Sequence, residues 1–316
     1  MARVSITRRN FLRCLAAGVA APLAGCSPIS FINGWVPSET YRATTGVAYG
    51  PNARHRLDIY SPRTAPASAP VIVFFYGGNW NRGDRSDYLF VGEALASRGY
   101  IAVVPDYRLY PEVRFPAFLD DSALAVRWTL DHIAEFGGDT RRVILMGHSA
   151  GAYNAAMLAL APAYLSAAGV EPRRIRGLIG LAGPYDFLPL TGPVTKEVFG
   201  FPDTAITTQP IHFATAAAPP ALLVTGAKDD VVNPGNSRRL AARLREQGAR
   251  AREIVYPDLG HRTLLGALAS PLRRLGPVLD DVAGFVNELS SEPASAGSLS
   301  LDLSHQDHRA GRLAGG

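Results

Sequence analysis

The sequence predicts an α/β fold: a mostly parallel central sheet with helices on both faces and a short cap. Two observations support this prediction. Strand-like apolar runs alternate with helical patterns along most of the chain, and the run Val71–Phe75 is continuously apolar, as expected of a parallel strand buried on both faces. With 316 residues and 47% hydrophobic content, the chain is long enough to bury the core of one large domain.

The expected elements follow one another in a regular order. Two early runs, Thr45–Tyr49 and Arg56–Tyr60, are expected to form an antiparallel edge. Further strands are expected at Val71–Phe75, Ile101–Val104, Val143–Met146, Ile175–Leu181, Ala221–Thr225 and Glu253–Tyr256. Helices are expected at Tyr88–Ser97, Phe118–Phe136, Ala152–Leu160, Asn236–Gln247 and Leu272–Leu289. The stretch Phe187–Pro219 has weak periodicity and is expected to be the cap, whose small size favours small or medium acyl substrates.

The motif Gly147-His148-Ser149-Ala150-Gly151 is the most informative stretch of the chain. It lies between a predicted strand and a predicted helix, which is the setting of a nucleophile elbow. The sharp turn exposes the serine side chain above the sheet, and the flanking glycines relieve crowding. Ser149 is therefore the candidate nucleophile, while His148 is expected to point away from it.

A serine hydroxyl needs an imidazole to take its proton and a carboxylate to orient that imidazole. One known order places the acid and then the histidine after the serine, each past a later strand. His261 fits as the base because it lies in a short loop just past Arg252–Tyr256. His305 and His308 lie in an unpatterned tail, and His212 precedes the candidate acids.

The acid is expected in the loop that follows Ala221–Thr225. Asp229 is preferred, and Asp230 is the alternative. A serine hydrolase also needs N–H groups to stabilise the oxyanion of the tetrahedral intermediate. The paired glycines of Tyr76-Gly77-Gly78-Asn79-Trp80 allow a close backbone approach, so the oxyanion hole is assigned to the N–H groups of Gly78, Asn79 and Ala150.

These residues resemble the carboxylesterase branch of the α/β-hydrolases, which includes hormone-sensitive-lipase-like esterases and arylformamidase-like enzymes. The resemblance covers residues 41–289, the expected catalytic domain. Tyr76 stands where that group usually has His, and Asn79 where many members have Gly. The connection that frames the site is similar in Asp106-Tyr107-Arg108-Leu109, Pro111, Phe115-Pro116 and Asp120-Asp121.

The resemblance implies the α/β-hydrolase fold and a serine hydrolase that cleaves carboxylic esters of small to medium acyl groups through an acyl-enzyme. An arylformamidase-like amide hydrolase and a non-enzymatic envelope binding protein remain alternatives. We expect no metal or cofactor, because no His, Cys and Asp spacing matches a zinc site. Four aromatic residues are expected to line the substrate pocket, although each alone is more often core packing: Trp80, Tyr107, Tyr153 and Tyr185.

Residues 1–25 are expected to be a signal peptide. Thr7-Arg8-Arg9-Asn10-Phe11-Leu12-Arg13 resembles a twin-arginine export signal, and Leu23-Ala24-Gly25-Cys26 resembles a bacterial lipoprotein lipobox. We expect cleavage before Cys26, lipid on its sulfur, and a protein anchored in the bacterial cell envelope, periplasmic or at the outer membrane. Residues 26–40 are expected to be a linker and residues 290–316 a disordered tail.

The formal net charge of +5 includes four arginines of the expected signal, so the mature chain would carry about +1. The composition therefore gives no indication of a nucleic-acid partner. Both cysteines, Cys14 and Cys26, are accounted for by the signal and the lipid anchor, so no disulfide is expected. The oligomeric state is left open.

Overall fold

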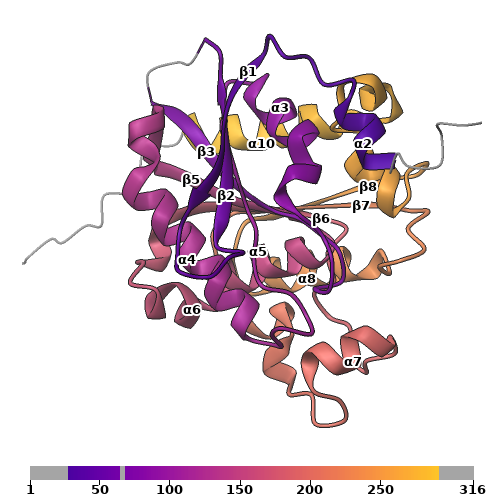
Figure 1. The fold of residues 1–316 in the computed structure, drawn as a ribbon. Coiled ribbons are helices and arrows are strands. Elements are labelled where there is room, and N and C mark those ends of the chain that lie inside the picture. Colours follow the sequence, from indigo (N-terminus) through magenta and orange to yellow (C-terminus); the bar gives the residue numbers. More distant parts are fainter. Residues whose placement is uncertain (1–27, 65–67, 292–316) are drawn as a thin grey trace, which may run out of the picture.

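The computed structural model describes residues 28–64 and 68–291, and this part of the chain forms an eight-stranded sheet (Figure 1). The strand order is β1-β2-β4-β3-β5-β6-β7-β8. β1 pairs antiparallel with β2, β2 pairs antiparallel with β4, and all other neighbours are parallel. The strands are β1 (Tyr41–Ala48), β2 (Arg56–Pro62), β3 (Ala69–Phe75), β4 (Ile101–Pro105), β5 (Gly138–His148), β6 (Ile175–Leu181), β7 (Ala221–Gly226) and β8 (Ala251–Tyr256).

Helices cover both faces of the sheet. α3 and α10 lie on one face, and α4, α5 and α8 lie on the other (Figure 1). The helices are α2 (Pro28–Asn33), α3 (Leu89–Ala96), α4 (Ala117–His132), α5 (Ala150–Leu160), α6 (Pro162–Ala167), α7 (Pro193–Phe199), α8 (Gly235–Glu246), α9 (His261–Gly266) and α10 (Val278–Ser291). Short 3-10 turns occur at Arg85–Tyr88, Ile133–Phe136, Pro172–Arg174, Ile206–Thr208, Pro210–Phe213 and Ser270–Leu275.

The central strands supply side chains to both apolar layers. In β3, Ile72 and Phe74 belong to the core under α3 and α10, whereas Val71, Val73 and Phe75 belong to the core under α4, α5 and α8. All five are fully buried. Successive side chains of a strand point to opposite faces, so a strand covered on both faces must be apolar throughout. The predicted α/β fold with its antiparallel edge is confirmed.

The last predicted helix is interrupted. Instead of one helix over Leu272–Leu289, the chain forms a 3-10 turn at Ser270–Leu275 and then α10, which begins at Val278. Gly276 and Pro277 separate the two elements, and Gly276 is fully extended with φ 173°. Proline lacks an N–H and its ring clashes with the preceding helical turn, so one continuous helix cannot form.

The segment expected to be a linker is packed against the domain. It contains α2, whose last residue, Asn33, donates from Nδ2 to the Asp87 carbonyl (3.0 Å) and accepts from the Phe90 N–H (3.2 Å). Ile32 and Val36 pack against the core. The domain therefore begins at α2, and the linker prediction is wrong for 28–40. The signal, Cys26 and the tail beyond residue 291 lie outside the described residues.

The stretch between β6 and β7 carries α7 and two 3-10 turns, and α7 projects from the body at the lower edge of Figure 1. Several hydrogen bonds attach this cap to the domain, and two of them involve residues near the Ser149 motif or α4. The Phe115 N–H donates to the Val198 carbonyl (3.0 Å), and the Tyr153 hydroxyl donates to the Thr208 carbonyl (2.7 Å). Tyr153 lies on α5, so the cap is held by the helix that follows the Ser149 motif.

A buried ion pair fixes α4 to the connection after β4. The Asp121 carboxylate accepts hydrogen bonds from the Arg108 N–H (2.9 Å) and from Arg108 Nη2 (2.6 Å), and Asp121 is fully buried. Removing one member of a buried pair leaves the other charge uncompensated.

Asp121→Asn should therefore lower the free energy of unfolding by about 3 kcal/mol. Asp120→Asn is the matched control, because Asp120 is the neighbouring residue on α4 and its side chain is exposed. This control should stay within about 0.5 kcal/mol of the wild type in urea unfolding. Equal losses in the two variants would contradict the assignment of the stabilisation to the buried pair.

Candidate active site

Ser149 lies at a sharp turn between β5 and α5. Its backbone has φ 56° and ψ −124°, and its N–H donates to the Leu181 carbonyl (2.9 Å). The turn is too crowded for side chains at its flanks. A Cβ on Gly147 would lie 2.2 Å from the Gly151 carbonyl oxygen, and a Cβ on Gly151 would lie 2.0 Å from the Phe75 carbonyl oxygen. The motif therefore requires both glycines.

The structure brings the three predicted triad residues together. Ser149 Oγ lies 2.9 Å from His261 Nε2, and His261 Nδ1 lies 2.9 Å from Asp229 Oδ2. His261 is the first residue of α9, and the preceding Gly260 N–H donates to Thr263 Oγ1 (2.8 Å). The alternative acid, Asp230, is exposed. The arrangement is a continuous hydrogen-bonded chain from hydroxyl to imidazole to carboxylate.

The local backbone supports the negative charge of Asp229. Its Oδ1 accepts the N–H groups of Val231 (2.9 Å) and Val232 (2.8 Å), and its side chain is fully buried. Burial by itself would raise the pKa of Asp229, but hydrogen bonds from His261 and from the two N–H groups outweigh it. The pKa therefore lies below its ordinary value, and the carboxylate stays ionised.

His148 is a residue of the site that sequence reasoning did not identify. Its Nε2 lies 3.1 Å from the His261 carbonyl oxygen, and the two imidazole centroids are 4.6 Å apart. Burial lowers the pKa of His148 to about 3, and the nearby charge of His261 acts in the same direction. A neutral imidazole that faces a carbonyl must carry its proton on that nitrogen. His148 therefore donates from Nε2 and supports the backbone of the base.

The glycine loop after β3 runs beside the serine. A Cβ on Gly77 would lie 2.8 Å from Ser149 Cβ, so the loop backbone and the nucleophile are in contact. Gly78 has φ 132°, and its carbonyl accepts the N–H groups of Asn81 and Arg82 (3.2 Å each). The predicted oxyanion donors Gly78 and Asn79 thus lie on the loop next to Ser149. The third predicted donor, Ala150, is the first residue of α5, where an N–H has no acceptor within the helix.

The four predicted pocket residues fall into two groups. Trp80 and Tyr153 belong to an aromatic cluster beneath the cap, with Trp80 5.2 Å from Tyr153 and 4.9 Å from Phe199 between ring centroids. All four side chains are buried, but Tyr107 and Tyr185 lie outside this aromatic cluster. The Tyr107 hydroxyl donates to the Tyr76 carbonyl (2.8 Å), and Tyr185 belongs to the core under α4, α5 and α8. Aromatic identity alone did not indicate which face each ring would occupy.

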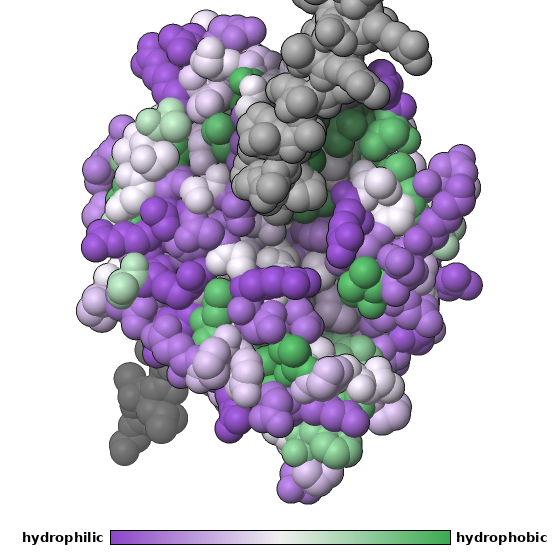
Figure 2. Space-filling view, turned by 45° about the vertical axis from the view of Figure 1, so that its right-hand side comes forward, coloured by the Kyte–Doolittle hydropathy of each residue, from purple (hydrophilic) through white to green (hydrophobic). Residues whose placement is uncertain are grey.

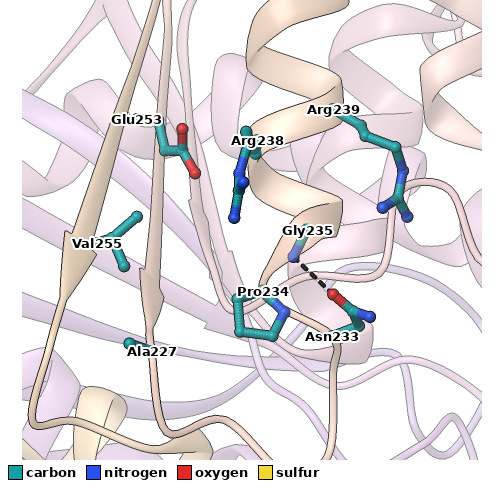
Figure 3. A pocket seen from close by; sticks show the side chains of 8 residues that line it. All are labelled: Ala227, Asn233, Pro234, Gly235, Arg238, Arg239, Glu253 and Val255. Carbon is teal, nitrogen blue, oxygen red and sulfur yellow. Dashed lines mark hydrogen bonds between the residues drawn. The ribbon is translucent and has the colours of Figure 1, made fainter.

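A surface depression of about 430 Å³ lies between β7, β8 and the start of α8 (Figure 3). Its wall includes Ala227 and Asn233, which flank the loop that carries Asp229. The Gly235 N–H donates to Asn233 Oδ1 (2.8 Å) within the wall. Neither Ser149 nor His261 lines this depression, so it lies behind the acid loop and apart from the candidate site.

Residues 57–244 match the family model described as BD-FAE. The chain belongs to the BD-FAE family. Among curated relatives of this BD-FAE protein, the esterase LipC of Mycobacterium tuberculosis is 28% identical over 265 residues, 77% of this chain and 64% of the relative. A probable isoprenylcysteine alpha-carbonyl methylesterase of Arabidopsis thaliana, ICMEL1, is 28% identical over 250 residues, 72% of this chain and 52% of the relative. The chain thus spans between half and two thirds of the length of these relatives.

Solved structures of similar shape have low sequence identity to this BD-FAE protein. A truncated carbohydrate esterase from gut microbiota superposes with a TM-score of 0.71 at 22% identity, covering 81% of this chain and 99% of that one. Esterase B from Lactobacillus rhamnosis gives a TM-score of 0.70 at 19% identity, covering 89% and 94%. These likenesses confirm the expected α/β-hydrolase fold.

The buried neutral state of His148 predicts a pH-dependent stability. With a folded pKa of about 3 against an ordinary value of 6.5, His148 binds a proton only in the unfolded chain between those two pH values. Its stabilising contribution is complete above pH 6.5 and falls by about 1.4 kcal/mol per pH unit below it. The difference in unfolding free energy between wild type and His148→Asn should therefore shrink from pH 7 to pH 4.5. Parallel pH curves for the two proteins in urea unfolding would contradict this account.

Proposed function

We propose that this chain is a serine hydrolase that cleaves carboxylic esters of small to medium acyl groups. One observation carries the proposal: the hydrogen-bonded chain Ser149–His261–Asp229 lies beside a glycine loop that contacts the serine. Relatives that match most of this chain, including LipC, are named as esterases. Those names support an ester as the substrate.

The first half of the proposed reaction acylates Ser149. His261 Nε2 takes the Ser149 hydroxyl proton as Oγ attacks the ester carbonyl carbon. The carbonyl oxygen becomes an oxyanion that faces the N–H groups of Gly78, Asn79 and Ala150. As the tetrahedral intermediate collapses, the C–O bond to the alcohol breaks and His261 returns the proton to the leaving oxygen. Ser149 is left acylated.

Water completes the cycle by the same route in reverse. His261 removes a proton from water, the hydroxide adds to the acyl carbon, and collapse releases the acid and restores the serine. Asp229 remains ionised throughout, because two backbone N–H groups and His261 bind its carboxylate. It fixes the tautomer of His261 and stabilises the imidazolium that forms in each step.

Ser149→Ala and His261→Ala should each reduce p-nitrophenyl butyrate hydrolysis to background, because the first removes the nucleophile and the second removes the general base. Asp229→Asn should retain a small rate, roughly 10³- to 10⁴-fold below the wild type, since it disturbs only the tautomer and charge of the base. Labelling by a fluorophosphonate should disappear in Ser149→Ala. The adjacent Asp230→Asn is the matched control and should keep wild-type rates.

Three results would redirect the proposal. If Asp230→Asn were the more damaging change, the acid would be misassigned. If N-formylkynurenine were hydrolysed faster than p-nitrophenyl acetate and butyrate, the chain would be an amide hydrolase with the same machinery. A folded wild type that neither labels nor turns over any of these substrates would favour the binding-protein alternative.

We propose further that the enzyme is exported and anchored by lipid at Cys26 in the cell envelope. The support is the Arg8-Arg9 signal pattern and the lipobox that ends at Cys26. Two exposed aromatic rings lie near the start of the described chain, Phe31 in α2 (64% accessible) and Trp35 just after it (63% accessible). Such rings favour the membrane interface.

Within residues 28–64 and 68–291, no helix is long and apolar enough to cross a bilayer. On the face shown in Figure 2, apolar side chains form small separate patches among polar ones.

Cys26→Ser should move the protein from the membrane fraction to the soluble fraction, because it removes the thiol that would carry lipid. Incorporation of an alkyne fatty acid should be lost in the same variant. Cys14→Ser is the matched control, since Cys14 lies within the expected signal and should leave lipid incorporation unchanged. Equal incorporation in wild type and Cys26→Ser would contradict the lipid anchor.

A further inference from the structure

The loop beside Ser149 has a strained backbone. Three consecutive residues have positive φ: Gly78 at 132°, Asn79 at 55° and Trp80 at 57°. This conformation suits glycine but is unfavourable for a residue with a Cβ, above all a bulky one such as tryptophan. No other residue fits at position 78, because a Cβ there would lie 2.1 Å from the Arg82 carbonyl oxygen. Such strain persists only where surrounding contacts hold the backbone in place.

The first of these contacts is made by Tyr76, at the N-terminal end of the loop. Its hydroxyl donates to Asp106 Oδ1 (2.6 Å) and accepts from Arg54 Nη2 (2.8 Å). Its ring stacks between Tyr88 and Tyr107, with centroids at 5.1 and 4.9 Å. Tyr76 is fully buried. Both the direction of the ring and the position of the hydroxyl are therefore fixed.

The second contact is made by Trp80, at the other end of the loop. Its indole Nε1 donates to Asn154 Oδ1 (3.0 Å), and its carbonyl accepts the Tyr110 N–H (2.8 Å). Asn154 is fully buried on α5, where its Nδ2 donates to Ser122 Oγ (3.4 Å). The helix that holds Trp80 through Asn154 begins at Ala150. The hydrogen bond from Trp80 to Asn154 therefore joins the loop that carries Gly78 and Asn79 to the helix that begins at Ala150.

We propose that Tyr76 and Asn154 are positioning residues for the oxyanion hole. Each holds one end of the strained loop, so the N–H groups of Gly78 and Asn79 keep their direction before substrate arrives. When either contact is lost, the loop relaxes toward unstrained conformations in which these donors turn away. This inference rests on the proposed ester hydrolysis. Because the donors bind charge that develops only in the transition state, their loss lowers kcat and leaves KM little changed.

The test compares Tyr76→Phe and Asn154→Leu with the wild type on p-nitrophenyl butyrate. Each variant should lose about 10- to 100-fold in kcat, with KM within about twofold. Tyr100→Phe is the matched control, since its buried hydroxyl also donates to a side chain, Asn287 Oδ1 (2.9 Å), but contacts α10 instead of the loop. This control should keep kcat within about twofold. Wild-type kcat in both loop variants, or an equal loss in Tyr100→Phe, would overturn the inference.

Asn154→Asp separates the indole contact from a general need for a buried amide. Its carboxylate still accepts from Trp80 Nε1, so its kcat should exceed that of Asn154→Leu by about tenfold.

Crystal structures of the loop variants give a result that does not depend on turnover. Loss of the positive φ at Asn79 or Trp80 supports the inference, and an unchanged loop overturns it. Failure of the wild type to hydrolyse esters would instead count against the proposed function alone.

Discussion

The site depends on one close approach, in which the turn around Ser149 touches the end of β3. Gly151 lies against the Phe75 carbonyl, and Gly77 lies against the Ser149 side chain. Both contacts are closer than a Cβ on the glycine would permit, so the two chain segments can approach each other only because these positions are glycine. Because β3 and β5 are hydrogen-bonded neighbours in the sheet, their register sets the height of the loop relative to the serine. The glycines therefore set the geometry of the candidate site as well as that of the turn.

The residues on either side of Ser149 extend this constraint to the rest of the site. His148 is the last residue of β5 and supports the carbonyl of the base, while Ala150 begins α5 and presents its N–H. His148 Nε2 lies 3.1 Å from the His261 carbonyl oxygen and Ser149 Oγ lies 2.9 Å from His261 Nε2, so two consecutive residues contact the first residue of α9. A shift of β5 by one residue would displace the nucleophile and the support of the base together.

Local signals were sufficient to predict the central strands, the elbow and the candidate triad, because the strands are apolar runs and the elbow and triad residues follow such runs. The break before α10 was also signalled locally by Pro277, but the apolar periodicity continues across it. Long-range pairs had no such signal. Arg54 meets Asp106 from a turn 52 residues away, and His148 meets His261 across 113 residues. Similarly, nothing local distinguishes Tyr153 beneath the cap from Tyr185 in the core.

Tyr76, at the start of the glycine loop, donates to the buried carboxylate of Asp106, whose charge would disfavour a nearby oxyanion unless it were neutralised. Together with Asp58 and Asp121, Asp106 pairs with three arginines, Arg54, Arg85 and Arg108. The formal charges of this group cancel, so its field weakens rapidly with distance. Tyr76 then presents a neutral hydroxyl to the group, and burial raises its pKa well above the ordinary value. The proposed oxyanion site is thus left to the N–H dipoles of the loop and α5, and the charge of Asp229 acts on His261.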